Sequence, residues 1–131
     1  MRVAIYSRVS THEQTTAGQL DELRAYCHRR QWEIVSEYTD EGVSGSKESR
    51  PGLNQLLADA KRRKFDVVLV YRYDRFARSL RQLVNALCEF DALGIHFVSL
   101  HEGVDTSTPN GRLVFGIFAS IPAILRNLKR N

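Results

Sequence analysis

Short apolar runs alternate along the chain with stretches in which apolar residues recur every three or four positions. Four runs rich in β-branched and aromatic residues predict strands over 3–6, 32–38, 67–71 and 95–100. The stretches that follow them predict helices, the last of which starts near 109. This alternation predicts an α/β fold in three layers: a mostly parallel sheet of four to five strands, helices on both of its faces, and a long C-terminal helix.

The predicted helix ends carry signals of their own. The spacings Thr-x-x-Gln at 16–19 and Ser-x-x-Gln at 79–82 are typical of capping boxes. Pro51 suits the first turn of a helix, and Gly94 is expected to end one. The turn-forming residues at 40–46 predict a loop. With no internal repeat or linker in this order, we expect a single domain over 1–131.

Composition narrows the class of protein. A hydrophobic content of 43% with 26% charged residues is typical of a globular domain. Because the sequence has no apolar run of about 18 residues and no secretory signal at its N-terminus, we expect a cytoplasmic protein without a membrane span. Two cysteines are too few for a disulfide framework or a zinc site, and the four histidines lack metal-ligand spacing. We therefore expect no metal.

The net charge of +4 is concentrated in one stretch of the chain. Residues 61–81 carry eight basic and two acidic side chains, and 15 of the 19 cationic residues in the whole sequence are arginines. Arginine binds phosphate through two parallel hydrogen bonds, so the stretch favours a phosphate-facing surface. For 61–64 taken alone, the alternative is a helix end that is simply solvated.

Polar residues that could carry chemistry follow every predicted strand. Ligands of open α/β sheets bind outside the carboxyl ends of the strands. The residues at these ends are Arg8 and Ser10, then Asp40, then Asp74, Arg75 and Arg78, and finally His101 and Glu102. A serine hydroxyl near several guanidinium groups indicates attack on phosphorus, with the cations stabilising the phosphate oxygens. The alternative for Ser10 alone is a loop serine that caps a turn.

Other familiar motifs are missing from the sequence. The first predicted strand is not followed by the glycine-rich pattern of a dinucleotide site or of a P-loop. Ser10 is not flanked by the glycines of a hydrolase nucleophile elbow. A nucleotide-binding signalling domain of similar topology is a further alternative, but its first loop would lack a glycine cradle for phosphate.

Four blocks of this sequence resemble serine site-specific recombinases of the resolvase/invertase family. The segment 6–14, Tyr-Ser-Arg-Val-Ser-Thr-His-Glu-Gln, resembles the family signature Tyr-x-Arg-Val-Ser-Thr-x-x-Gln. The segments 40–53, 73–79 and 108–114 resemble three further blocks, and the likeness runs from residue 2 to about 121.

The resemblance implies a defined reaction and a set of site residues. Family members cut both DNA strands through a serine that becomes joined to a 5′-phosphate, exchange subunits and religate, without metal or other cofactor. It implies that Ser10 is the nucleophile and that Asp74 orients the phosphate-binding arginines. A plain ion pair of Asp74 with Arg75 or Arg78 is the alternative, and it is compatible with that orienting role. The implied phosphate-binding arginines are Arg8, Arg50, Arg75 and Arg78, and the implied supporting or DNA-binding residues are Tyr6, Gln14, Gln19, Asp40, Arg72 and Arg81.

The C-terminal stretch departs from the family pattern. The helix-turn-helix domain that follows the long helix in small members is absent, so DNA binding is expected to be weak, and Pro122 replaces part of an Ala-Glu-Phe-Glu-Arg block. Apolar residues at coiled-coil spacing predict a homodimer or tetramer through this helix, or else a helix packed on its own sheet: Val114, Phe118, Ile121, Leu125 and Leu128. The alternative function is an inactive fragment that pairs with an intact recombinase and regulates it.

Overall fold

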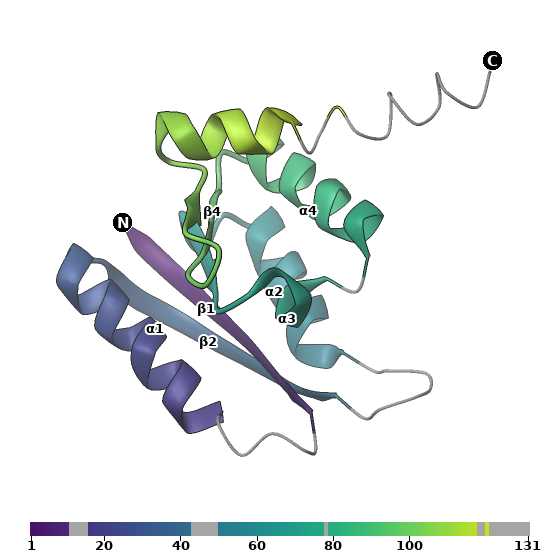
Figure 1. The fold of residues 1–131 in the computed structure, drawn as a ribbon. Helices are drawn as coiled ribbons and strands as arrows, with labels where there is room; N and C mark the ends of the chain where they lie inside the picture. Colours follow the sequence, from purple (N-terminus) through teal and green to yellow (C-terminus); the bar gives the residue numbers. More distant parts are fainter. Residues whose placement is uncertain (11–15, 43–49, 78, 118–119, 121–131) are drawn as a thin grey trace.

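The computed structural model describes residues 1–10, 16–42, 50–77, 79–117 and 120. The elements in chain order are β1 (Arg2–Ser10), α1 (Thr16–Arg30), β2 (Glu33–Gly42), α2 (Pro51–Lys61), β3 (Val67–Val70), α3 (Tyr73–Phe76), α4 (Leu80–Ala92), β4 (His96–Ser99) and β5 (Val104–Asp105) (Figure 1). Residues 109–117 form a further helix after β5. Among the described residues, no helix is both long and apolar enough to cross a membrane.

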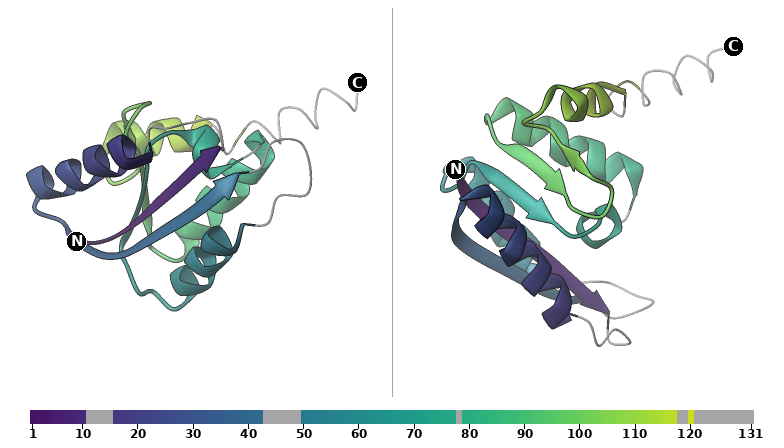
Figure 2. Two further views of the ribbon diagram at one scale, coloured as in Figure 1. Left: turned by 90° about the horizontal axis from the view of Figure 1, so that it is seen from below. Right: turned by 60° about the vertical axis from the view of Figure 1, so that its left-hand side comes forward.

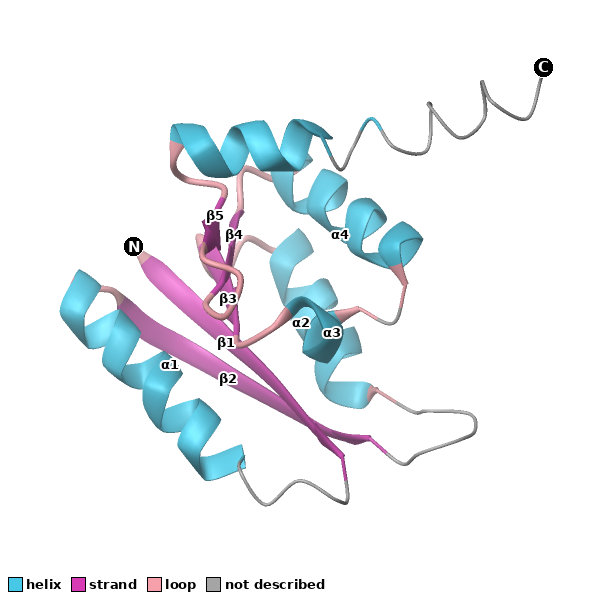
Figure 3. Ribbon diagram, in the orientation of Figure 1, coloured by secondary structure: helices cyan, strands magenta, loops and turns pink. Residues whose placement is uncertain are grey.

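The strands form a single five-stranded sheet in the order β2-β1-β3-β4-β5 (Figure 3). Strands β1 to β4 are parallel, and the short β5 runs antiparallel to β4. In this register Tyr6 of β1 lies beside Tyr38 of β2 and Val70 of β3. The predicted mostly parallel sheet is therefore confirmed, and the carboxyl ends of β1, β2 and β3 meet at one edge.

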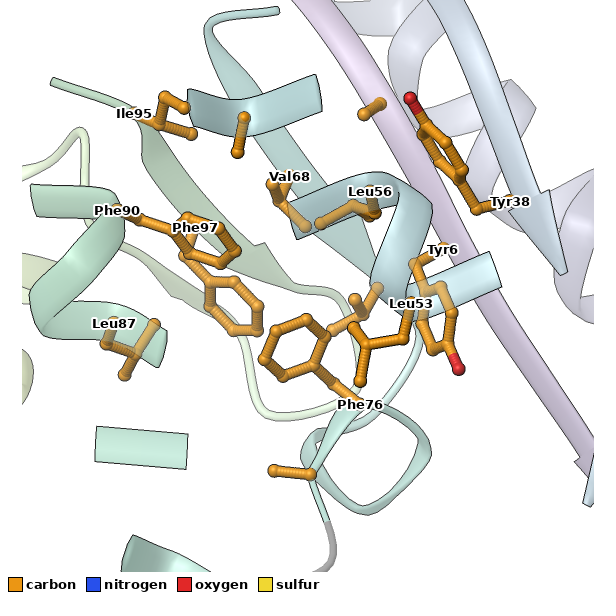
Figure 4. Packing of buried hydrophobic residues seen from close by; sticks show 14 of the residues in the cluster. Tyr6, Tyr38, Leu53, Leu56, Val68, Phe76, Leu87, Phe90, Ile95 and Phe97 are labelled. Atoms are coloured by element: carbon orange, nitrogen blue, oxygen red, sulfur yellow. The ribbon is translucent and has the colours of Figure 1, made fainter. Parts of the chain in front are cut away.

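Helices cover both faces of the sheet, as predicted (Figure 2). On one face α1 packs its Leu23 against Val3 and Ile5 of β1. On the other face α2 and α4 bury a larger, aromatic cluster that includes Phe76 and Phe97 (Figure 4). Successive strand residues point to opposite faces, so a strand covered on both sides is apolar throughout. This is why β1 and β3 were predictable from short continuous apolar runs.

Strands β1 and β2 extend further toward the carboxyl edge than predicted. Strand β1 continues through Ser10, and β2 continues through Gly42, so the loop predicted from residue 40 is wrong for 40–42. The two strands remain paired there, with Arg8 opposite Asp40 and Ser10 opposite Gly42. Hydrogen bonds between backbone groups keep β1 and β2 paired where their side chains are polar. Pairing of this kind produces no hydrophobic pattern in the sequence from which the strand ends could be predicted.

The predicted helix ends are mostly confirmed. Ser79 is the N-cap of α4, and its side chain accepts a hydrogen bond from the Gln82 amide at 3.1 Å. Gly94 follows α4 with a φ of +74°, a conformation that glycine adopts without strain, and Pro51 is the first residue of α2. Helix α1 begins at Thr16 itself rather than after it. The helix predicted from 109 is present as far as 117, and its remaining expected length lies outside the described residues.

The start of the helix at 109–117 depends on a close backbone approach at Gly111. Thr108 donates from its hydroxyl to the Asp105 carbonyl at 2.8 Å and accepts from the Gly111 amide at 3.1 Å. A Cβ built on Gly111 would lie 1.6 Å from that same carbonyl oxygen. No side chain fits between the helix and the end of β5, so glycine is required here.

Replacing Gly111 with alanine is expected to force the helix away from β5 and to lower the free energy of unfolding by about 2 kcal/mol or more. Urea denaturation followed by circular dichroism measures this change. Gly116→Ala in the same helix is the matched control, because a Cβ there meets nothing within 4 Å. That control is expected to be neutral or stabilising by up to about 1 kcal/mol, so equal losses in both variants would contradict the prediction.

Candidate active site

A chain of buried polar contacts joins β1, β2 and α2 at the carboxyl edge. The Tyr6 hydroxyl donates to Asp40 Oδ2 at 2.8 Å and accepts from Arg50 Nη2 at 2.9 Å. Tyr6 is fully buried, and Asp40 and Arg50 are 4% and 7% exposed. Burial, reinforced by the Asp40 charge and opposed by Arg50, raises the pKa of Tyr6 above its usual range. The phenol therefore stays protonated and fixes the relative positions of the acid and the guanidinium.

Asp40 also closes the N-terminus of α2. Its two carboxylate oxygens accept from the Gly52 amide at 2.7 Å and from the Leu53 amide at 2.9 Å. The N-cap residue of this helix, Arg50, provides no side-chain cap of its own. A carboxylate from the neighbouring strand thus satisfies two amides that the helix leaves unpaired, and it complements the positive end of the helix dipole. The same group anchors the helix and the Tyr6–Arg50 pair.

Gly52 leaves the space that Asp40 needs for these contacts. A Cβ at Gly52 would lie 2.9 Å from both Asp40 Oδ1 and the Thr39 carbonyl oxygen. We expect Gly52→Ala to break the capping contacts and to lower the free energy of unfolding by about 1–3 kcal/mol, measured by chemical denaturation. Gly18→Ala in α1, where a Cβ meets nothing within 4 Å, is the control and is expected to be slightly stabilising. An unchanged midpoint for Gly52→Ala would refute this assignment.

The short helix α3 brings the predicted acid and further arginines to the same edge. Arg8 Nη1 donates to the Asp74 carbonyl at 3.3 Å, and Arg50 Nη2 donates to the Arg75 carbonyl at 3.2 Å. The Asp74 carboxylate is largely exposed and lies 3.4 Å from Arg72 Nε. The alternative pairs of Asp74 with Arg75 or Arg78 stay predictions, and Arg78 lies outside the described residues. Three segments that are distant in sequence therefore meet around one helical turn.

Aromatic packing fixes α3 on the sheet. Phe76 is 2% exposed, and its ring meets that of Tyr6 edge-on with centroids 6.1 Å apart (Figure 4). The same ring lies 5.2 Å from Phe97 of β4. At the other end of α3 the Tyr73 ring stacks on Phe97, with centroids 6.1 Å apart, while Arg8 and Arg50 contact the backbone of the helix.

One amino group of Arg50 makes no hydrogen bond within the part of the chain that the structure describes. This group, Nη1, is buried and has no partner among the described residues, and Arg50 as a whole is 7% exposed. Buried guanidinium groups normally have all their donors satisfied, because an unmade hydrogen bond to a charged group is costly. A donor held in this way suits an oxygen of a phosphate group, and the positive charge suits an anion.

The structure assembles seven of the predicted site residues. They are Tyr6, Arg8, Asp40, Arg50, Arg72, Asp74 and Arg75. Gln19 is buried in α1, which packs on the sheet face opposite to Tyr6, and Arg81 is exposed in the first turn of α4. Ser10 is the last residue of β1, but its side chain lies outside the described part, as do Gln14 and Arg78. The role of Gly52 was not predicted, although a glycine directly after Pro51, the first residue of the helix, can indicate a close approach at a helix N-terminus.

The basic stretch 61–81 does not form one continuous surface. Residues 61–64 precede β3 and lie at the amino end of the sheet, where Lys64 is 3.5 Å from Asp59 and Lys61 is 3.9 Å from Glu89. Arg72 and Arg75 follow β3 at the opposite end. Residues 61–64 are exposed, which favours the solvated helix end for them, and we restrict the expected phosphate-facing surface to the cations after β3.

Comparisons with known proteins agree with this geometry. Residues 3–131 match the family model described as "Resolvase, N terminal domain". The chain is 38% identical over 128 residues to a probable DNA-invertase of Sinorhizobium fredii and 33% identical over 123 residues to the transposon Tn917 resolvase of Enterococcus faecalis. These alignments cover 97% and 94% of this chain but only 39% and 62% of the two relatives.

A solved structure is similar over the same range. The crystal structure of the N-terminal catalytic domain of TP901-1 integrase has a TM-score of 0.87 and 39% sequence identity, and the match covers 98% of both chains. The resemblance seen in the sequence blocks is thus confirmed over nearly the whole chain. This protein belongs to the resolvase family, and residues 3–131 correspond to the N-terminal domain of that family.

Proposed function

We propose that this chain is a serine recombinase catalytic domain that cleaves and rejoins DNA. The Ser10 oxygen attacks a phosphodiester phosphorus, the bond from phosphorus to the 3′-oxygen breaks, and the serine proton is transferred as the 3′-hydroxyl leaves. The product is a 5′-phosphoserine and a free 3′-hydroxyl. Attack of a 3′-hydroxyl on the phosphoserine reverses the step. One phosphodiester replaces another in each direction, so bond energy is retained without a high-energy cofactor.

The observation that carries this proposal is the buried guanidinium of Arg50. Its Nη1 lacks a partner within the described residues, while Nη2 is held by the Tyr6 hydroxyl and the Arg75 carbonyl. A donor fixed in advance stabilises charge that develops on a phosphate oxygen without any reorganisation during the reaction. Phosphoryl transfer depends mainly on such positioning and positive charge.

We assign the other residues of this edge to supporting roles. Arg8 and Arg75 add positive charge around the phosphate, and Asp74 orients this cluster through its pair with Arg72. Tyr6 and Asp40 hold Arg50 through their buried hydrogen bonds. The remaining expected contacts with phosphate or DNA are those of Arg78, Arg81 and Gln14. They stay predictions, as does a supporting role for Gln19. The proposed substrate places the activity in the cytoplasm.

The names of the relatives favour the catalytic interpretation over the regulatory fragment. The matched proteins are named as an invertase and a resolvase, and the matched structure as a catalytic domain. All the arginines and acids that the proposal needs are present in this sequence.

The test supplies DNA binding from outside the chain. The full 131-residue chain is fused at its C-terminus to a DNA-binding domain of known site and incubated with plasmids in which two such sites flank a randomised spacer. We expect an SDS-resistant adduct, a free 3′-hydroxyl at the break, and a nucleotide mass on the peptide that contains Ser10. The DNA-binding domain alone is the control. No adduct with any spacer would reject the proposal.

We further propose that a second copy of this chain covers the helix at 109–117, giving a homodimer or tetramer. Leu113 and Ile117 are one turn apart on this helix and are 65% and 55% exposed. Of the predicted coiled-coil positions only Val114 is described; the others lie outside the described residues. Apolar side chains exposed side by side favour an interface.

The double variant Leu113→Ser with Ile117→Ser is expected to convert an oligomer into a monomer, as measured by light scattering after gel filtration. Each leucine or isoleucine buried at an interface contributes roughly 1.5–3 kcal/mol to the free energy of association, so the loss of two per subunit is enough to dissociate the oligomer. Val35→Ser on β2, where the side chain is 37% exposed, is the control and leaves the mass unchanged. A wild-type monomer at high concentration would exclude the interface.

A further inference from the structure

We infer that Glu102, a residue outside the assembled site, positions the active-site helix α3. Its carboxylate oxygen Oε1 accepts from the backbone amide of Tyr73, the first residue of α3, at 3.2 Å. The same oxygen accepts a hydrogen bond from the Ser99 hydroxyl at the end of β4. The inference rests on the proposed function, because its consequence is the placement of Asp74 and Arg75 for phosphoryl transfer.

Glu102 lies on a turn that is itself fixed to the sheet. The Leu100 amide donates to the Val70 carbonyl at 3.0 Å, and the His101 amide donates to the Tyr71 carbonyl at 2.8 Å. Ser99 is fully buried, and Gly103 takes a φ of +68° that lets the chain reverse. The exposed carboxylate of Glu102 therefore projects from a fixed backbone, and a buried hydroxyl holds its orientation.

Helix α3 needs such a contact from elsewhere. It has only four residues, and its N-cap Arg72 makes no side-chain capping bond. The Ala77 amide closes the single turn by donating to the Tyr73 carbonyl at 2.9 Å. An isolated turn of this length is not stable by itself. Phe76 anchors the C-terminal end of α3 in the core, and the Tyr73 ring stacks on Phe97 with centroids 6.1 Å apart. These ring contacts leave the backbone amide of Tyr73 unbound, and Glu102 is the group that binds it.

The position of α3 decides the geometry of the site. Its backbone carbonyls receive Arg8 and Arg50, and its side chains supply Asp74 and Arg75. If the first residue of α3 frays, Asp74 moves first, because it directly follows the amide that Glu102 holds. Displacements of about 1 Å in a catalytic group lower rates by roughly 10²-fold, so an effect without direct contact with DNA is expected.

The experiment compares Glu102→Ala with the conservative variant Glu102→Gln. The amide oxygen of glutamine still accepts from Ser99 and Tyr73, whereas alanine cannot. In the same fusion protein we expect Glu102→Ala to slow adduct formation roughly 10- to 100-fold at unchanged DNA affinity, and Glu102→Gln to stay within about threefold of wild type. Glu22→Ala on the exposed surface of α1 removes the same charge and serves as the control.

Hydrogen exchange of the Tyr73 amide, measured on the 131-residue chain, provides a readout that does not depend on activity. We expect this amide to exchange at least about tenfold faster in Glu102→Ala than in wild type or Glu102→Gln. Unchanged exchange, or equal adduct rates in Glu102→Ala and Glu22→Ala, overturns the inference, as does a glutamine variant as slow as alanine. If the wild-type fusion forms no adduct, the proposed function fails, and with it the catalytic consequence of the Glu102 contact. The exchange of the Tyr73 amide still shows, separately, whether Glu102 holds α3.

Discussion

Ser10→Ala is expected to abolish covalent attachment to DNA while the protein remains folded. Without the hydroxyl no phosphoserine can form, and a water molecule in its place would give a break without a protein adduct. Ser10 is the last residue of β1 and pairs with Gly42 through the backbone, so alanine leaves the ladder intact. The adduct on denaturing gels is the measurement, and circular dichroism checks the fold.

Ser7→Ala is the matched control for this prediction. Ser7 lies on the same strand, is 1% exposed, and its hydroxyl is 3.1 Å from that of Thr39. Its loss is expected to lower stability by about 1 kcal/mol without removing the adduct. An adduct that persists in Ser10→Ala would show that another residue is the nucleophile.

Arg50→Lys is expected to slow adduct formation by roughly 10³-fold although the charge is conserved. The guanidinium contacts the Tyr6 hydroxyl and the Arg75 carbonyl through Nη2, and Nη1 is the donor that we propose for a phosphate oxygen. A single ammonium group cannot reach all three positions from one place. We also expect a loss of about 1–2 kcal/mol in the free energy of unfolding, because the buried Tyr6 hydroxyl loses a donor.

Arg24→Lys separates this effect from a general preference for arginine. Arg24 lies on α1 and binds Glu37 with two hydrogen bonds, at 2.7 and 2.9 Å, on the exposed surface. Its replacement is expected to leave the rate of adduct formation unchanged. A rate for Arg50→Lys within tenfold of wild type, measured as a single-turnover rate constant at saturating protein, would contradict the assigned role.

The fold was predictable wherever burial determines the residue type. Strands 3–6 and 67–70 are covered on both faces and therefore read as continuous apolar runs. The ends of β1 and β2 were missed because their pairing depends on the backbone and their side chains are polar. Helix α3 was missed because four residues are too few to show a helical period.

The site was predictable in part. The position of Arg8, Asp40, Asp74 and Arg75 at the carboxyl edge of the sheet followed from topology alone. Arg50 entered only through the resemblance, because it precedes a helix and reaches Tyr6 by tertiary packing. No spacing rule shows that Asp40 caps α2 or that Glu102 holds α3, since these contacts join segments 12 and 29 residues apart.

The separation of the cations at the two ends of β3 has a kinetic consequence. The four residues of β3 span about 10 Å, which is about the Debye length at 0.1 M ionic strength. At physiological salt the field of residues 61–64 is therefore largely screened before it reaches the carboxyl edge. In dilute buffer the same cations attract DNA to the wrong end of the sheet, so encounters become more frequent while the productive fraction of them falls. The association rate measured at low ionic strength thus overstates how often DNA reaches the arginines that follow β3.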